Sequence, residues 1–133
     1  MDIKQILDSA KNIAIIGLSP DEDKPSNMIS RYLIKENYNV FPIYPKFETI
    51  LNQKVYRSLD EIKEHIDIVV MFRKGVYAKN LIKECIENKV KTLWLQLGIT
   101  NKEAREIASQ NDINFIEDRC IMVEHKLIKG KQW

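Results

Sequence analysis

The sequence predicts an α/β fold in which a five-stranded parallel sheet lies between two layers of helices. Short apolar runs of strand length alternate along the chain with stretches whose apolar residues recur at helical spacing. The short runs are apolar nearly throughout, which is typical of strands that are covered on both faces. Parallel strands need right-handed crossover connections, and these place helices on both faces of the sheet.

Five segments are expected to form the sheet, each short and mostly continuous in hydrophobicity. In chain order they are Asn12–Ile16, Asn39–Ile43, 66–71, Thr92–Leu95 and Asn114–Ile116. Because helical stretches separate all five, the expected connections are crossovers that travel back over the sheet.

Helical spacing fills the intervals between these strands. The residues expected to share helix faces are Met28, Ile29, Tyr32 and Leu33, then Ala78, Leu81, Ile82, Cys85 and Ile86, then Ala104, Ile107 and Ala108. Residues 58–62 are expected to form a shorter helical crossover, and helices over 2–8 and 119–129 bracket the core. The pattern as a whole predicts one Rossmann-like, three-layer α/β/α domain over residues 1–133.

Length and composition restrict the function. A chain of 133 residues can bury a real core but leaves no room for a second full-sized domain. Lys+Arg 21 against Asp+Glu 19 gives a net charge of +2, which argues against a nucleic-acid or anionic-membrane binder. Cys85 and Cys120 form no CxxC pair and have no His at zinc-ligand spacing, so we expect neither a disulfide framework nor a metal site. With no signal-peptide pattern at the N-terminus, the cytoplasm is the expected compartment.

Ligands of such sheets bind beyond the carboxyl ends of the strands, so the loops there are the candidate site. After the first strand, Gly17 permits a sharp turn and close approach of a ligand, and Ser19 offers a hydroxyl. Lys24 adds a positive charge, and Pro25-Ser26 begin a helix whose free N–H groups favour an anion. The loop is therefore a candidate phosphate site, with an ordinary turn and a Ser cap as the alternative.

The second strand end indicates which nucleotide would fit. The dinucleotide fingerprint G-x-G-x-x-G is missing, and Lys46 stands where an NAD-binding protein would carry an acid. A lysine there tolerates a phosphorylated ribose, which both NADP and coenzyme A carry, and the missing glycines lean against NADP. The alternative is that Lys46 is a solvated loop charge.

Two further strand ends carry polar or flexible residues. Phe72 and Arg73 follow the third strand, where a guanidinium could hold a phosphate and an aromatic ring could pack on the ligand. Gln96 and Gly98 follow the fourth. The convergence of four such strand ends is the main sign of a ligand site.

These residues resemble a known family, the small stand-alone CoA-binding proteins, over about residues 10–127. The motifs that carry the resemblance are Gly17-Leu18-Ser19, Lys24-Pro25-Ser26, Tyr44-Pro45, Ser58-Leu59-Asp60-Glu61-Ile62, Asp67-Ile68-Val69, Phe72-Arg73, Trp94-Leu95-Gln96-Leu97-Gly98-Ile99 and Asp118-Arg119-Cys120. The chain is also similar to the CoA-binding domain of the succinyl-CoA synthetase alpha subunit.

The resemblance implies a role for each matching residue. Gly17, Leu18 and Ser19 would wrap the pyrophosphate with Lys24 and Ser26 beside it, Pro45 and Lys46 would flank the adenosine with Phe72 and Arg73 opposite, and Gln96, Gly98 and Ile99 would face the pantetheine. Tyr44 replaces the Asn that relatives commonly carry. The synthetase works through a phosphorylated His in another domain, and neither His65 nor His125 lies in a comparable motif, so that activity is not carried over.

The leading prediction is therefore non-catalytic binding of coenzyme A or an acyl-CoA, without nucleic acid or membrane partners. The alternative is a small NADP-dependent oxidoreductase with Tyr44 or Tyr77 as proton donor. A protein partner or a homodimer stays open. Cys85 is expected in the core, whereas Cys120, with His125 a turn away, is a candidate for a mixed disulfide with the CoA thiol or for a thiolate–imidazole pair.

Overall fold

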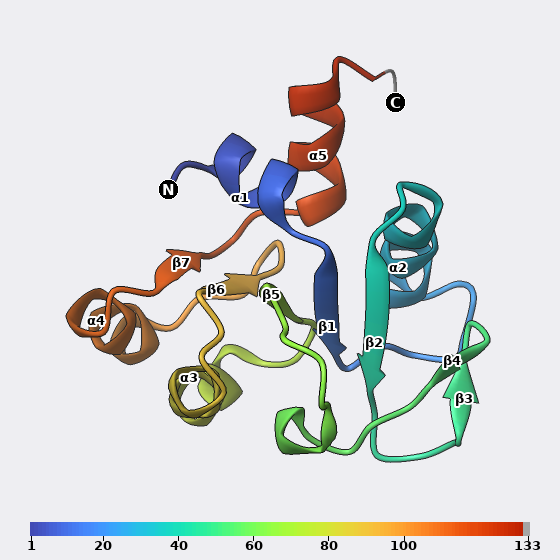
Figure 1. Ribbon diagram of the computed structural model, residues 1–133, viewed down its shortest axis with the longest axis horizontal. Coiled ribbons are helices and arrows are strands. Elements are labelled where there is room, and N and C mark those ends of the chain that lie inside the picture. Colours follow the sequence, from blue (N-terminus) through green and yellow to red (C-terminus); the bar gives the residue numbers. More distant parts are fainter. Residues whose placement is uncertain (132–133) are drawn as a thin grey trace.

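A computed structural model describes residues 1–131 and contains the predicted parallel sheet with helices on both faces (Figure 1). The strands are β1 (Asn12–Ile16), β2 (Asn39–Ile43), β3 (Thr49–Ile50), β4 (Gln53–Lys54), β5 (Ile68–Met71), β6 (Thr92–Leu95) and β7 (Asn114–Ile116). The α-helices are α1 (Ile3–Ser9), α2 (Pro25–Lys35), α3 (Ala78–Glu87), α4 (Lys102–Gln110) and α5 (Ile121–Lys129). Two 3-10 turns, η1 (Leu59–Glu61) and η2 (Gly75–Tyr77), precede β5 and α3.

The main sheet has the strand order β2-β1-β5-β6-β7, and all of its pairings are parallel. The chain steps from β1 to β2 on one side and then crosses over to β5 on the other. The order therefore reverses between β1 and β5, and at such a point the crossovers diverge and leave a crevice beyond the strand ends.

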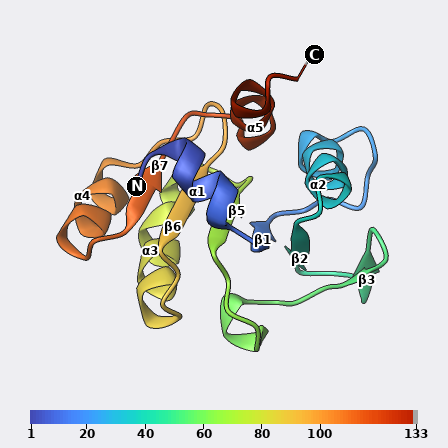
Figure 2. The same ribbon diagram turned by 45° about the horizontal axis from the view of Figure 1, so that its top comes forward.

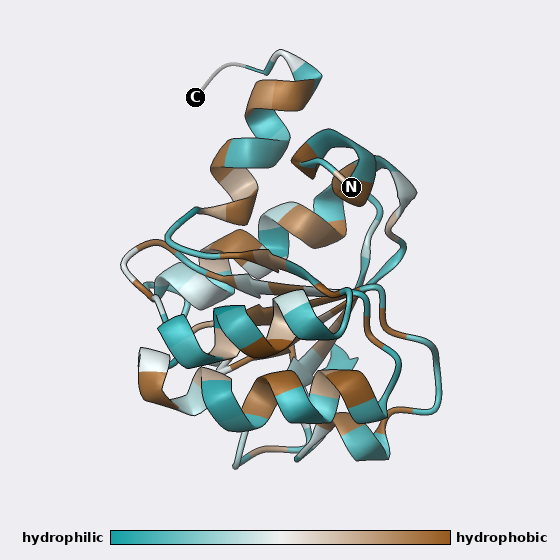
Figure 3. Ribbon diagram, turned by 90° about the vertical axis from the view of Figure 1, so that its left-hand side faces the viewer, coloured by the Kyte–Doolittle hydropathy of each residue, from teal (hydrophilic) through white to brown (hydrophobic). Residues whose placement is uncertain are grey.

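Two hydrophobic clusters cover the faces of the sheet, as expected for strands buried on both sides. One packs α3 and α4 against it through Leu81 and Ala104, and the other packs α1, α2 and α5 through Leu7, Leu33 and Ile121. Figure 3 shows the largely hydrophobic strands between the two helical layers. No helix within residues 1–131 is long and apolar enough to cross a membrane.

The structure corrects several details of the sequence prediction. The strand expected over 66–71 begins at Ile68, and the crossover helix expected over 58–62 is a single 3-10 turn. Met28, expected on the buried face of α2, is 46% exposed, while Ile29 and Leu33 are buried. The antiparallel hairpin β3–β4, which was not predicted, lies beside the β2 edge of the sheet (Figure 2).

Candidate functional site

A cleft opens at the carboxyl ends of β1 and β2, beside the point where the strand order reverses. It has a volume of about 290 Å³ and is lined by Ile16, Gly17, Ile43, Tyr44, Pro45, Arg57 and Arg73. A second cavity of about 170 Å³ shares Ile16, Ile43, Arg57 and Arg73 with it and reaches between η1 and α3. The two volumes therefore meet along the same strand ends, with two guanidinium groups on their common walls.

Gly17 lines the cleft at the turn directly after β1. Its φ of +83° lies in the left-handed region, and its N–H donates to the Ile43 carbonyl at 3.0 Å. A Cβ at this position would lie 3.2 Å from both the Arg73 Cγ and the Phe72 carbonyl oxygen. The turn therefore requires glycine, and so does the space beside Arg73 and Phe72. The sharp turn predicted from the sequence at Gly17 is present.

The rest of the first loop is fastened to the start of α2. The Ser19 N–H donates to the Ser26 Oγ at 2.9 Å, and the Asn27 Nδ2 donates to the Ser19 carbonyl at 2.9 Å. Leu18, between Gly17 and Ser19 in the chain, is fully buried in the core. Lys24 is the exposed N-cap residue of α2 and makes no capping hydrogen bond with its side chain. The loop is thus held by backbone hydrogen bonds and by the side chains of Ser26 and Asn27, and not by the Lys24 side chain.

Of the twelve residues proposed from the sequence, the structure brings Gly17, Pro45 and Arg73 together on the cleft wall. Phe72 is half-buried against the core under α2, and its N–H donates to the Ile16 carbonyl at 2.9 Å. Lys46 is exposed on the neighbouring loop and is not among the residues that line the cleft. Most of the twelve residues follow the carboxyl end of a strand, whereas Lys24 and Ser26 lie at the start of α2. Only Gly17, Pro45 and Arg73 line the cleft.

The loop after β6 is bound to its own neighbours instead. The Gln96 side chain is buried, and its Oε1 accepts the Ile121 N–H at 2.9 Å at the start of α5. The Gly98 N–H donates to the Asp118 Oδ1 at 2.7 Å, and Ile99 packs on the core beneath α3 and α4. Gln96, Gly98 and Ile99 line neither cavity.

Arg57 is the cleft residue that sequence reasoning missed. Its Nη1 donates to three backbone carbonyls, those of Tyr44 and Phe47 at 2.9 Å and that of Lys46 at 3.2 Å. Arg57 precedes η1 in the chain and reaches back to the loop after β2. The sequence signal is an Arg directly before the Ser58-Leu59 turn, but its placement depends on the unpredicted β3–β4 hairpin.

The charge around the cleft is mainly positive, with one acidic group deeper inside. The Arg73 guanidinium lies over the Tyr77 ring, 4.1 Å from its centroid, which limits the orientations of the side chain. Glu84 of α3 lines the inner cavity, and burial raises the pKa of its carboxyl, with smaller contributions from Asp60 and Glu87. Within residues 1–131, no group of three or more His, Cys, Asp or Glu side chains could hold a metal ion.

The cysteines and histidines lie away from the cleft walls. Cys85 is buried in the core as predicted, and burial raises the pKa of its thiol to about 12. His125 is buried, and its Nδ1 lies 2.6 Å from the Tyr32 hydroxyl. The structure therefore pairs the His125 imidazole with a tyrosine, whereas Cys120 stands half-buried at the start of α5.

Residues 11–126 match the family described as the CoA binding domain. The chain belongs to this CoA-binding domain family. The match includes the whole cleft and every strand of the main sheet.

Similar proteins agree with this membership. The uncharacterized protein YneT of Bacillus subtilis is 34% identical, over 96% of this chain and 95% of its own length. The solved structure of a hypothetical protein from Pyrococcus horikoshii superimposes with a TM-score of 0.93 at 32% identity, over 97% of this chain and 91% of that chain. The ADP-forming acetate–CoA ligase of Methanocaldococcus jannaschii is 28% identical over 84% of this chain, which spans 17% of the ligase.

Proposed function

We propose that the protein binds coenzyme A or an acyl-CoA through the ADP moiety, in the cleft at the carboxyl ends of β1, β2 and β5. The observation that carries the proposal is the placement of Gly17, Arg57 and Arg73 around one cleft in a chain of the CoA-binding domain family. The missing side chain at a glycine allows a diphosphate to approach the backbone closely, and two guanidinium groups can neutralise its charge.

In this proposal the diphosphate lies over the Gly17 turn, within reach of Arg73. The adenosine extends toward Tyr44 and Pro45, where an aromatic ring and a proline give an apolar surface for the base. The pantetheine arm then leaves the cleft toward solvent or a partner. The fully buried Leu18 would contribute through its backbone alone.

We further propose that this chain binds without carrying out chemistry of its own. Burial raises the pKa of the Cys85 thiol and of the Tyr38 hydroxyl to about 12, and both groups lie in the hydrophobic core rather than at the cleft. The buried His125 lies beside Tyr32 and does not line the cleft either. Glu84 of α3 is the acidic group in the inner cavity, and it does not line the outer cleft in which the ADP moiety is placed. The ligase relative is several times longer, so its activity belongs to more than this region.

Calorimetric titration with CoA, NADP and NAD tests the proposal. CoA is expected to bind, with weaker binding of NADP and the weakest of NAD. Arg73→Ala should weaken CoA about tenfold or more, because a charge-assisted contact to phosphate is lost. Lys35→Ala, at the exposed far end of α2, removes the same charge and should leave binding unchanged. Tight NADP binding with no response to CoA would instead establish the dinucleotide alternative.

A further inference from the structure

Arg57 combines a fixed guanidinium with hydrogen-bond donors that the loop does not use. Its Nη1 is engaged with the carbonyls of Tyr44, Lys46 and Phe47. These bonds hold the side chain in one orientation although 41% of it is exposed. Arg57 lies on the walls of both cavities, so the group faces the ligand space as well as the loop.

The Nη2 edge of Arg57 has a weakly held partner. Its Nη2 lies 3.7 Å from the Glu48 Oε1, and the Glu48 side chain is 96% exposed. An ion pair at this distance, in contact with water, contributes little stability. A phosphate that reaches the same edge could therefore displace the carboxylate at small cost.

Arg57 differs in this respect from Lys46, the charge that the sequence placed beside the adenosine. The Lys46 side chain is exposed outside the cleft lining, and its carbonyl serves as an acceptor for Arg57. A flexible lysine side chain loses conformational entropy when it binds a phosphate. The Arg57 side chain has already lost most of its conformational entropy, because the loop carbonyls hold its guanidinium.

The distribution of positive charge in the cleft favours two phosphate positions. Arg73 stands beside Gly17, and Arg57 stands beside the Tyr44–Pro45 wall that the adenosine would occupy. We propose that Arg57 is the residue that selects ligands carrying a phosphate on the adenosine ribose. This inference rests on the proposed binding of CoA, and it adds a specificity residue that the sequence did not identify.

The experiment compares CoA with 3′-dephospho-CoA, which differ by that one phosphate, in calorimetric titrations of the wild type and of Arg57→Gln. The wild type is expected to prefer CoA, and Arg57→Gln should reduce the ratio of the two affinities about tenfold, as loss of a charge-assisted hydrogen bond would. Because Arg57 also holds the loop, a purely structural role would weaken both ligands equally and leave the ratio unchanged, which would overturn the proposal.

Three further variants sharpen the test. Glu48→Gln removes the competing carboxylate and should raise the affinity for CoA more than for 3′-dephospho-CoA. Lys63→Gln, an exposed charge remote from the cleft lining, should leave the ratio as in the wild type. The third variant is Lys46→Gln. If it loses the preference for CoA over 3′-dephospho-CoA while Arg57→Gln keeps that preference, the selection belongs to Lys46 and the proposal is wrong. A wild type that binds both ligands equally would overturn the inference while leaving the proposed function standing, and failure to bind either would overturn both.

Discussion

Gly17 and Gly98 have nearly the same backbone conformation in different surroundings. Their φ angles are +83° and +82°, but a Cβ at Gly17 would lie 3.2 Å from Arg73 and Phe72, while one at Gly98 would meet no atom within 4 Å. Gly98→Ala therefore incurs only the left-handed strain, about 1 kcal/mol of unfolding free energy. Gly17→Ala incurs that strain together with displacement of its neighbours.

Alanine substitutions at these two glycines test whether the Gly17 turn binds the diphosphate, with Gly98 as the control. We expect Gly17→Ala to be the less stable of the two in urea denaturation and to lose affinity for CoA, because the added methyl group pushes Arg73 away from the diphosphate. Gly98→Ala should keep the affinity of the wild type. Equal losses of affinity for CoA in both variants would mean that the Gly17 turn is not the diphosphate site.

Individual residues were predictable from the sequence where a chemical type coincides with a strand end. Gly17 and Arg73 directly follow apolar runs, and both line the cleft. Gln96 follows one too, but its polar group is used by the backbone of α5, a contact between segments 25 positions apart in the chain. Arg57 does not follow a strand of the main sheet, so only the folded crossover brings it to the site.

Helix α5 begins without a side-chain cap from its own N-cap residue. Cys120 makes no capping hydrogen bond, and the Gln96 Oε1 accepts the Ile121 N–H in its place. The strand end thus supplies the acceptor that a Ser or Asp would supply elsewhere.

Gln96→Leu should consequently destabilise the protein by about 1–3 kcal/mol, since it leaves a buried N–H without its acceptor. Gln96→Glu keeps an oxygen at the positive end of the helix and should recover most of that stability at neutral pH. Denaturant unfolding of the two variants measures the difference. If the two variants are equally destabilised, the contact to α5 is not what Gln96 contributes.

The elements of the main sheet were predicted well because apolar runs and helical spacing are strong local signals. The β3–β4 hairpin was missed because its turn lacks the glycine that usually indicates a tight turn in a sequence. Its turn residues, Leu51 and Asn52, both adopt positive φ. Its strands are two residues each, too short for any periodicity. Contacts between the two ends of this segment accompany the hairpin: Arg57 donates to the Tyr44 carbonyl, and the Tyr44 N–H donates to the Tyr56 carbonyl.

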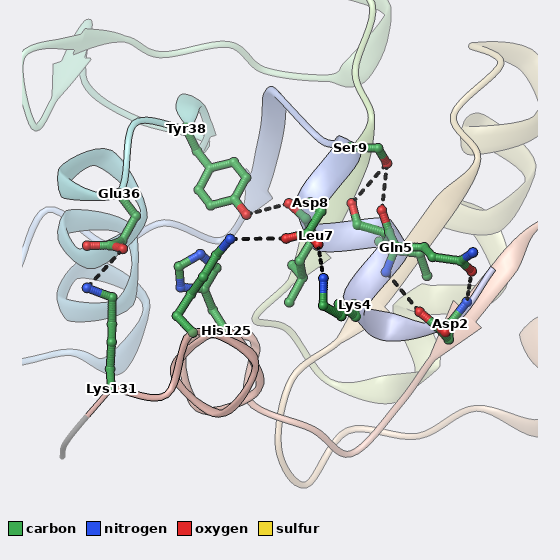
Figure 4. A network of polar contacts seen from close by, with 12 residues as sticks. Asp2, Lys4, Gln5, Leu7, Asp8, Ser9, Glu36, Tyr38, His125 and Lys131 are labelled. Atoms are coloured by element: carbon green, nitrogen blue, oxygen red, sulfur yellow. Dashed lines mark hydrogen bonds and ion pairs between the residues drawn. The ribbon is translucent and has the colours of Figure 1, made fainter.

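The helical layer formed by α1, α2 and α5 is joined by polar contacts around one buried imidazole (Figure 4). The Tyr38 hydroxyl donates to the Leu7 carbonyl at 2.6 Å, and the Tyr32 hydroxyl lies beside the His125 Nδ1. Ion pairs at the surface link the same helices through Lys129 with Asp8 and Lys131 with Glu36.

Burial lowers the pKa of His125 below its ordinary value of 6.5. The charges of Glu36 and Asp8 oppose this shift, and those of Lys129 and Lys131 add to it. Between the lowered pKa and 6.5 the unfolded chain binds more protons than the folded one, so the free energy of unfolding falls as the pH drops below 6.5. At pH values above 6.5 this contribution is fully present.

The variant His125→Phe, which fills the site without titrating, tests this dependence. We expect its unfolding free energy in denaturant to change less than that of the wild type between pH 7.5 and 5. A wild-type curve that runs parallel to that of the variant would assign the acid sensitivity to other groups. Because the imidazole lies in the helical layer rather than at the cleft, the affinity of the folded protein for CoA should not share this dependence.

The strand order has a consequence for the motions of the molecule. β1 pairs with β2 from Asn12 with Asn39 and with β5 from Ile13 with Ile68, so the cleft exists only while both pairings are closed. A ligand held there opposes every opening that separates any of the three strands. A bound ligand would therefore slow the hydrogen exchange of backbone amides along β1, β2 and β5, including amides that it does not contact.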